Sequence, residues 1–253
     1  MKRIFTLALC LLASTALFAQ TTQVIAHRGF HATKNSVRNS LSALQNAQDF
    51  GAFGSECDIN ETADGVLVVV HGPMHGEYEV QKTDYATLRA KALENGEVLP
   101  TLEEYLIQAK KNVKTKLIIE IKDHNTPSRE TRVVKNILKM VKKHKLVNDV
   151  EYIAFRQHVC DELVKYGPKG IKVAYLNGTL TPEYCKDLGY TGIDYNISVM
   201  QKNPAWIKQS QALGLTVNVW TVNDTERIQW CIDQKVDYIT TDNPEEVNRL
   251  LGK

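Results

Sequence analysis

Short apolar runs alternate with amphipathic segments along almost the whole of this 253-residue chain. The apolar runs are rich in valine and isoleucine, which is typical of buried strands, and the segments between them carry apolar residues at helical spacing. We predict eight strands, at residues 24–27, 55–60, 117–122, 151–155, 172–175, 192–195, 215–220 and 236–240. A helix is expected after each strand.

Strict alternation of strand and helix implies a parallel sheet with helices outside it. Eight such units in about 230 residues predict an α/β fold, the (β/α)8 TIM barrel. The alternative is a doubly wound open sheet. That fold places a glycine-rich phosphate loop after its first strand, and the polar segment after residues 24–27 is not glycine-rich.

The first 19 residues have the pattern of a secretory signal peptide. Lys2 and Arg3 precede an apolar stretch at 4–18, and Ala19 offers a small residue for cleavage. The stretch is short for a membrane-spanning helix. We therefore expect a periplasmic or secreted protein without a stable membrane anchor, with residues 20–253 forming one barrel domain.

One segment interrupts the alternation. Residues 72–99 follow the second strand and its hairpin, contain three Gly residues and one Pro, and show one short helix near 85–92. Long loops in compact domains tend to be functional, so we interpret this segment as an insertion over one end of the barrel. Thr101 and Glu104 then predict a capping box at a helix start, and an earlier helix is expected over 37–50.

The composition argues against some partners. The chain has 31 basic and 29 acidic side chains, so it offers no electrostatic case for nucleic acid. The cysteines beyond the signal are widely spaced, at 57, 160, 185 and 231. They fall inside predicted strands or helices, which favours buried free thiols over disulfides.

Ionisable residues gather at the ends of the first three strands, where a TIM barrel builds its active site. They are His27, Arg28, Glu56, Asp58, His71, Glu120 and Lys122. In a strand, residues two apart share a face, so Glu56 and Asp58 should project together. The third strand presents Glu120 and Lys122 in the same way.

Three carboxylates next to two imidazoles form the parts of a metal-assisted acid–base site. Glu56, Asp58 and Glu120 are hard oxygen ligands, which suit Ca²⁺ or Mg²⁺. No cysteine or histidine pair has the spacing typical of zinc. Arg28 and Lys122 add the positive charge that an anionic phosphate substrate requires.

Five other histidines lack such company. We expect His31 and His75 near the mouth of the barrel, and His124, His144 and His158 on the surface. A histidine at a strand end is more often structural than catalytic. For His27 and His71 the neighbouring carboxylates reverse that judgement. Buried carboxylates themselves need a counter-charge, and a metal is the simplest one.

In its motifs the chain resembles the glycerophosphodiester phosphodiesterase family. The matching segments, in order, are His27-Arg28-Gly29, Asn39-Ser40-Leu41, Glu56-x-Asp58, Asp64-Gly65, His71, Val98 to Glu104, Glu120-x-Lys122 and Val219 to Asn223. Each is weak alone, and the ordered set is specific.

The resemblance implies the roles of single residues. Glu56, Asp58 and Glu120 match the family's divalent-metal ligands, and His27 and His71 its general acid and base. Arg28 and Lys122 match phosphate-contacting positions, and Trp220 an aromatic residue at the substrate mouth. Trp220 could equally be a packing residue that caps the barrel. The implied reaction hydrolyses a small-molecule phosphodiester to an alcohol and a glycerol 3-phosphate-type product. One histidine would deprotonate a hydroxyl or water while the other protonates the leaving alkoxide.

Two positions depart from the family pattern. Arg38 stands where the family usually has glutamate, and Gly72 where it usually has aspartate. They leave two alternatives open. One is a related phospholipase-type barrel acting on a phosphoinositide or lysophospholipid, and the other is a catalytically silent barrel that binds phosphorylated ligands.

Overall fold

The computed structural model describes residues 22–33 and 35–253, and it confirms the eight predicted barrel strands. They are β1 (Gln23–Ala26), β2 (Gly54–Glu61), β6 (Lys116–Ile121), β7 (Val150–Ala154), β8 (Val173–Tyr175), β9 (Gly192–Asn196), β10 (Thr216–Trp220) and β11 (Tyr238–Thr241). Every neighbouring pair among them is parallel, and β1 pairs with both β11 and β2. The sheet therefore closes on itself as a (β/α)8 barrel.

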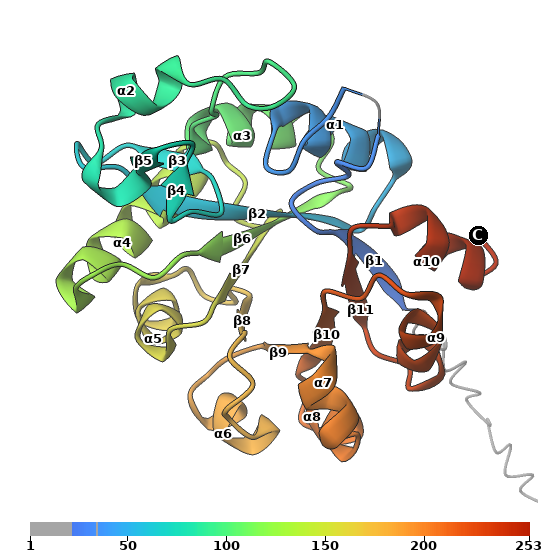
Figure 1. The fold of residues 1–253 in the computed structure, drawn as a ribbon. Coiled ribbons are helices and arrows are strands. Elements are labelled where there is room, and N and C mark those ends of the chain that lie inside the picture. Colours follow the sequence, from blue (N-terminus) through green and yellow to red (C-terminus); the bar gives the residue numbers. More distant parts are fainter. Residues whose placement is uncertain (1–21, 34) are drawn as a thin grey trace, which may run out of the picture.

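Helices surround the barrel and cover the outer face of its strands (Figure 1). The main ones are α1 (Leu41–Phe50), α3 (Leu102–Ala109), α4 (Pro127–Lys143), α5 (Gln157–Tyr166), α6 (Pro182–Asp187), α7 (Ile197–Lys202), α8 (Ala205–Ala212), α9 (Thr225–Asp233) and α10 (Pro244–Leu250). α7 is an additional short helix between β9 and α8. None of the described helices is long and apolar enough to cross a lipid bilayer.

The two faces of each strand pack into different cores. Outward residues of β2 and β6, such as Cys57 and Ile119, join the large cluster beneath the helices. Inward residues such as Ile25 and Ile118 form a smaller cluster inside the barrel. A Cβ on Gly54 would lie 3.1 Å from Ile118 and 3.2 Å from Ile25, so glycine fits this narrow level of the barrel. Charged residues lie above that level.

The helix predicted at residue 37 begins later, at Leu41. Asn39 has a φ of 62° in the left-handed region, which a right-handed helix cannot contain. The Ser40 side chain then caps the helix by accepting a hydrogen bond from the amide of Ala43 at 3.0 Å. Because the helix begins at Leu41, residues 36–39 form a loop at the end of the barrel.

The insertion contains several short elements: β4 (Met74–His75), β5 (Tyr78–Glu79), the 3-10 helix η1 (Val80–Lys82) and α2 (Tyr85–Ala90). It follows β3 (Leu67–Val69), which pairs antiparallel with β2 as the predicted hairpin requires. The capping box of Thr101 and Glu104 at the start of α3 is confirmed. In Figure 1 the insertion lies beside α1 and α3, near the end of β2.

The four cysteines outside the predicted signal are buried free thiols, as expected. The predicted signal peptide, 1–19, lies outside the described residues.

Candidate active site

Three carboxylates from two adjacent strands meet inside the barrel. Glu56 and Asp58 project from β2 and Glu120 from β6, with Asp58 directly opposite Glu120 in the strand register. One oxygen from each lies within 4.8 Å of the others, and all three residues are buried. The structure thus brings together the three acids that the sequence predicts as ligands.

These acids are incompletely satisfied. Glu56 Oε2 accepts a hydrogen bond from the Arg28 amide at 2.8 Å, but the buried Oε1 of Glu56 and Oδ1 of Asp58 have no hydrogen-bond partner among residues 22–33 and 35–253. Burial first, and then the charges of Asp58 and Glu120, raise the pKa of Glu56 well above its usual value. Burial and the charge of Asp58 likewise raise the pKa of Glu120 to about 7. Such a group of acids favours a bound cation.

Two cations flank the acids. Lys122 Nζ lies 2.5 Å from Glu120 Oε1 and 3.4 Å from Asp58 Oδ1, and Arg28 Nε lies 3.2 Å from Asp58 Oδ2. Burial would raise the pKa of Asp58, yet Lys122 and Arg28 hold it below its usual value. Asp58 is therefore the acid that stays ionised most readily.

His27 is oriented by an acid from the last strand's end. Its Nδ1 lies 2.8 Å from Oδ1 of Asp242, which also receives His31 Nε2 at 2.9 Å. The second oxygen of Asp242 accepts a hydrogen bond from Asn223 at 2.9 Å. Burial would raise the pKa of Asp242, but its bonds to the two histidines hold it well below its usual range. An ionised carboxylate at Nδ1 leaves Nε2 of His27 available for proton transfer.

His71 lies across the same cavity. Burial and the nearby charge of Lys122 lower its pKa below the usual value, which favours the neutral imidazole. A neutral imidazole can accept a proton. The two predicted acid–base residues thus lie in different electrostatic surroundings.

The catalytic cavity measures about 110 Å³ and is lined by most of the predicted residues. They are His27, Arg28, Glu56, His71, Glu120, Lys122 and Trp220. Asp58 does not line the cavity. Trp220 lines the cavity, and its ring also packs edge-on against Phe155, with the ring centroids 5.5 Å apart.

The family model for the glycerophosphoryl diester phosphodiesterase family matches residues 27–246. The chain belongs to this family. Membership makes it an enzyme of the phosphoric diester hydrolase class, which agrees with the resemblance of the motifs.

Relatives of this chain match over nearly their full length. A solved glycerophosphodiester phosphodiesterase from Parabacteroides distasonis is 45% identical, with a TM-score of 0.90 over 92% of this chain and 98% of that one. A glycerophosphodiester phosphodiesterase from Caldanaerobacter subterraneus is 27% identical over 92% of this chain and 98% of its own length. An Oleispira antarctica phosphodiesterase, solved in complex with the product sn-glycerol-3-phosphate, is 21% identical with a TM-score of 0.79, over 92% and 98% of the two chains.

The residues present suit a divalent cation. A metal ion would provide partners for the orphaned oxygens of Glu56 and Asp58, and it would offset the repulsion that raises the pKa values of Glu56 and Glu120. All-oxygen ligands fit a hard cation better than a thiophilic one.

Two polar residues next to the site received no role from sequence reasoning. Asn39 donates from Nδ2 to Asp58 Oδ2 at 2.8 Å, and its Oδ1 accepts the Asp58 amide at 3.2 Å. Asp242 holds His27, as described above. The signal for Asp242 was available, because closing a barrel places the last strand next to the first.

The two departures from the family pattern have different surroundings. Gly72 has a φ of +66°, and a Cβ there would lie 2.9 Å from Asn60 Nδ2, so the local backbone accounts for glycine. Arg38 is 55% exposed, and its Nη2 lies 3.7 Å from Asp242 Oδ2. Neither position displaces a metal ligand or a predicted acid–base residue.

The structure corrects one histidine prediction. His124 is not on the surface: it is 2% exposed, and its Nε2 accepts a hydrogen bond from the Glu61 amide at 3.2 Å. His124 lies in a polar segment after β6, which suggested a surface position. Its partner, Glu61, is far away in the sequence. His31 and His75 both line a second pocket beside the site, as expected for mouth residues.

Proposed function

We propose that this protein is a metal-dependent glycerophosphodiester phosphodiesterase that uses His27 and His71 as its acid–base pair. The substrate would be cleaved by water to an alcohol and glycerol 3-phosphate. The relative from Oleispira antarctica supports the glycerol 3-phosphate side of this assignment through the product in its complex.

One observation carries the proposal. The buried acids Glu56, Asp58 and Glu120 lie together, and the described residues give no hydrogen-bond partner to Glu56 Oε1 or Asp58 Oδ1; the two histidines and two cations predicted to act on a phosphodiester lie in the same region. In a merely structural acid cluster these buried oxygens would be hydrogen-bonded. This arrangement fits hydrolysis better than silent binding of a phosphorylated ligand.

The chain's own residues divide the work. Arg28 and Lys122 bind the phosphoryl oxygens and hold the phosphorus between the histidines. Neutral His71 accepts a proton from the attacking hydroxyl or water. His27, held at Nδ1 by Asp242, gives a proton to the leaving alkoxide. One bond from oxygen to phosphorus forms and the one to the leaving alcohol breaks.

Glu56, Asp58 and Glu120 would hold the cation. When bound, Ca²⁺ or Mg²⁺ supplies Lewis-acid stabilisation of the negative charge on the phosphoryl oxygens. Both ions prefer oxygen ligands, and they differ in how strictly they require octahedral geometry.

We further propose that the protein is exported and acts in the periplasm or outside the cell as a single barrel domain, residues 20–253. The support is the basic and apolar pattern of residues 1–19. Sequencing the N-terminus of the protein recovered from the periplasm and medium tests this. A mature chain that still begins at Met1 would contradict it.

Turnover of a panel of glycerophosphodiesters, with and without EDTA, tests the catalytic proposal. We expect EDTA to abolish hydrolysis and Ca²⁺ or Mg²⁺ to restore it. His27→Ala and His71→Ala should each lower kcat by about a hundredfold or more. Lysophospholipids and phosphoinositides in the same panel test the phospholipase-type alternative.

Two outcomes would overturn parts of the assignment. Hydrolysis that persists in EDTA and in Glu56→Ala would remove the metal. A near-wild-type rate in either histidine variant would remove that residue from acid–base catalysis. His158→Ala serves as a control, because that ring contacts only Thr131 and Pro127 in the described structure.

A further inference from the structure

A second pocket opens beside the catalytic cavity. It measures about 500 Å³ and is lined by His31, Ser36, Val37, Arg38, His75, Gly76, Lys91, Ala92, Leu93 and Glu94. We call it the headgroup pocket. The catalytic cavity, at about 110 Å³, is smaller than ordinary ligand sites of about 300–1,000 Å³, whereas the headgroup pocket falls within that range. By volume, the headgroup pocket is therefore the better of the two for holding the leaving group of a substrate.

The headgroup pocket is joined to the catalytic residues through Asp242. His31 and Arg38 line the pocket, and both contact the carboxylate that orients His27. Asn39, the residue after Arg38, contacts Asp58. The same loop thus forms a wall of the pocket and supports the site.

Hydrogen bonds fix the walls of this pocket relative to one another. Glu97 accepts the amide of Leu41 at 3.1 Å, and Asn95 donates to the Asn35 carbonyl at 3.1 Å, which ties the insertion to the loop before α1. His75 Nε2 lies 2.9 Å from the Lys91 carbonyl and joins the remaining wall. The pocket is therefore already formed.

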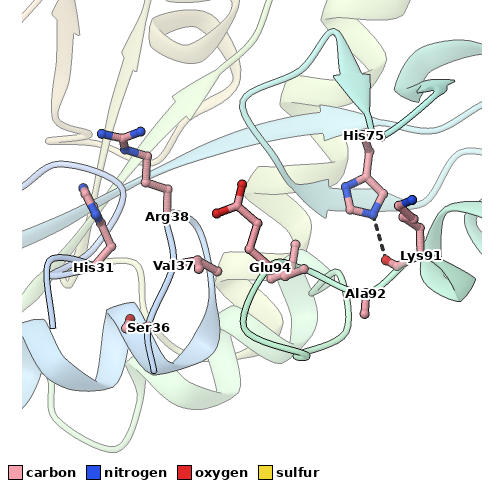
Figure 2. A pocket seen from close by; sticks show the side chains of 10 residues that line it. His31, Ser36, Val37, Arg38, His75, Lys91, Ala92 and Glu94 are labelled. Atoms are coloured by element: carbon pink, nitrogen blue, oxygen red, sulfur yellow. Dashed lines mark hydrogen bonds between the residues drawn. The ribbon is translucent and has the colours of Figure 1, made fainter. Parts of the chain in front are cut away.

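Opposite charges face this pocket without pairing with each other. Figure 2 shows the Glu94 carboxylate pointing toward the side of the pocket that carries Arg38. Glu94 makes no hydrogen bond or ion pair within the part of the chain that the structure describes, and Arg38 has only its 3.7 Å contact with Asp242 there. Lys91, on the far side, is paired with Glu77 at 3.4 Å. Arg38 and Glu94 are thus the two charges available to a ligand.

We propose that the headgroup pocket selects a leaving alcohol that carries both a carboxylate and an ammonium group, the chemistry of a serine headgroup. Arg38 binds the carboxylate and Glu94 binds the ammonium. The inference rests on the proposed function, and it names the substrate class of the same site. Arginine suits a carboxylate because its planar fork donates two parallel hydrogen bonds.

Other headgroups satisfy only part of this pocket. An ethanolamine alcohol offers an ammonium to Glu94 and leaves Arg38 without a partner. A glycerol alcohol offers neither charge. A purely anionic headgroup would pair with Arg38 but would be repelled by Glu94.

The test compares kcat/KM for three substrates of the full chain with added Mg²⁺ or Ca²⁺: sn-glycero-3-phosphoserine, sn-glycero-3-phosphoethanolamine and sn-glycero-3-phosphoglycerol. We expect the serine diester to be the best. Arg38→Gln should lower its kcat/KM about tenfold or more relative to the ethanolamine diester. Glu94→Gln should lower the serine and ethanolamine diesters by a similar factor relative to the glycerol diester.

Matched controls exist on the surface. Arg227 is also 55% exposed and lies 3.7 Å from an acid, Asp224, so Arg227→Gln copies the Arg38 change away from the pocket. Glu183→Gln removes an exposed carboxylate of α6 that forms no ion pair within the described part of the chain. Both controls should leave the order of the three substrates unchanged.

The outcomes separate this inference from the proposed function. Hydrolysis without preference for the serine diester, or with equal selectivity in Arg38→Gln and Arg227→Gln, overturns the headgroup assignment alone. Absence of hydrolysis for every diester overturns the proposed function. In that case calorimetric binding of sn-glycero-3-phosphoserine still decides the inference: about tenfold weaker binding to Arg38→Gln and Glu94→Gln supports it, and equal binding overturns it.

Discussion

Strand β2 carries buried carboxylates at two places, and their surroundings shift the pKa values of Glu56 and Glu61 in opposite directions. Glu56 and Asp58 face into the barrel, where two of their oxygens have no hydrogen-bond partner. Glu61, at the end of the same strand, is fully buried and faces Arg129 at 3.0 Å and Arg132 at 2.5 Å. The arginines hold the pKa of Glu61 below its usual value despite burial, whereas burial and like charges raise the pKa of Glu56.

The difference lies in the partners and not in burial. Glu61 also has its backbone satisfied, since Arg129 donates to its carbonyl at 2.8 Å. Its site is closed to any further ligand. Among the described residues, Glu56 Oε1 and Asp58 Oδ1 keep acceptor positions without a hydrogen bond, and Glu56 lines the catalytic cavity, which favours binding of a cation. We therefore expect Glu56 and Asp58 to govern activity and Glu61 to govern stability.

The largest expected effect is on activity. Glu56→Gln should lower kcat/KM by about a thousandfold, since a metal supplies several kcal/mol of charge stabilisation in the transition state. The metal-free variant should unfold at the same or higher denaturant concentration than the metal-free wild type, because one source of repulsion is gone. Steady-state kinetics and urea unfolding in EDTA measure both. A large loss of stability would place Glu56 in the same class as Glu61.

Asp242 tests an intermediate case, an acid paired with titratable histidines. Asp242→Asn should lower kcat by about ten- to a hundredfold while KM stays within about threefold, because the variant loses the charge that supports His27. Kinetics across the substrate range separate the two parameters. A change in KM alone would show that Asp242 shapes the pocket and does not position His27.

Glu61→Gln should reverse the pattern of Glu56. We expect it to lower the free energy of unfolding by about 2–3 kcal/mol, since it weakens hydrogen bonds between charged groups. The kcat of the folded fraction should remain close to that of the wild type. Urea titration with activity measured on the same samples checks this. A strong loss of kcat without loss of stability would break the comparison.

The smallest effect concerns His124, the neighbour of Glu61. Burial and then the charge of Arg129 lower its pKa to about 4. Between its ordinary value near 6.5 and about 4 the unfolded chain binds a proton that the folded chain does not, so stability falls as pH falls through this window. His124→Gln should remove about 1–2 kcal/mol of the decrease between pH 7 and pH 5. If the free energy of unfolding decreased equally between pH 7 and pH 5 in the variant and the wild type, this expectation would be contradicted.

The strands and the residues on them or just beyond their ends were predictable, whereas contacts made by more distant loop residues were not. Period-two alternation places Glu56, Asp58 and Glu120 on one face whatever the rest of the chain does. Asn39 reaches Asp58 only because it adopts a left-handed backbone conformation, which pattern analysis had assigned to a helix. His124 was misplaced for a similar reason, since its partner comes from a different element.

Asp58 lies opposite Glu120 because β2 and β6 pair in one register, and a shift of β2 by one residue would turn Glu56 and Asp58 outward. The barrel strands therefore fix the positions of these acids. Arg38 and Glu94, in contrast, lie on connecting loops. Such loops tolerate insertion and exchange far better than strands do. For protein engineering, a lineage of this design can acquire new substrates by replacing residues 72–99 or 35–38 while the hydrolytic chemistry stays where it is.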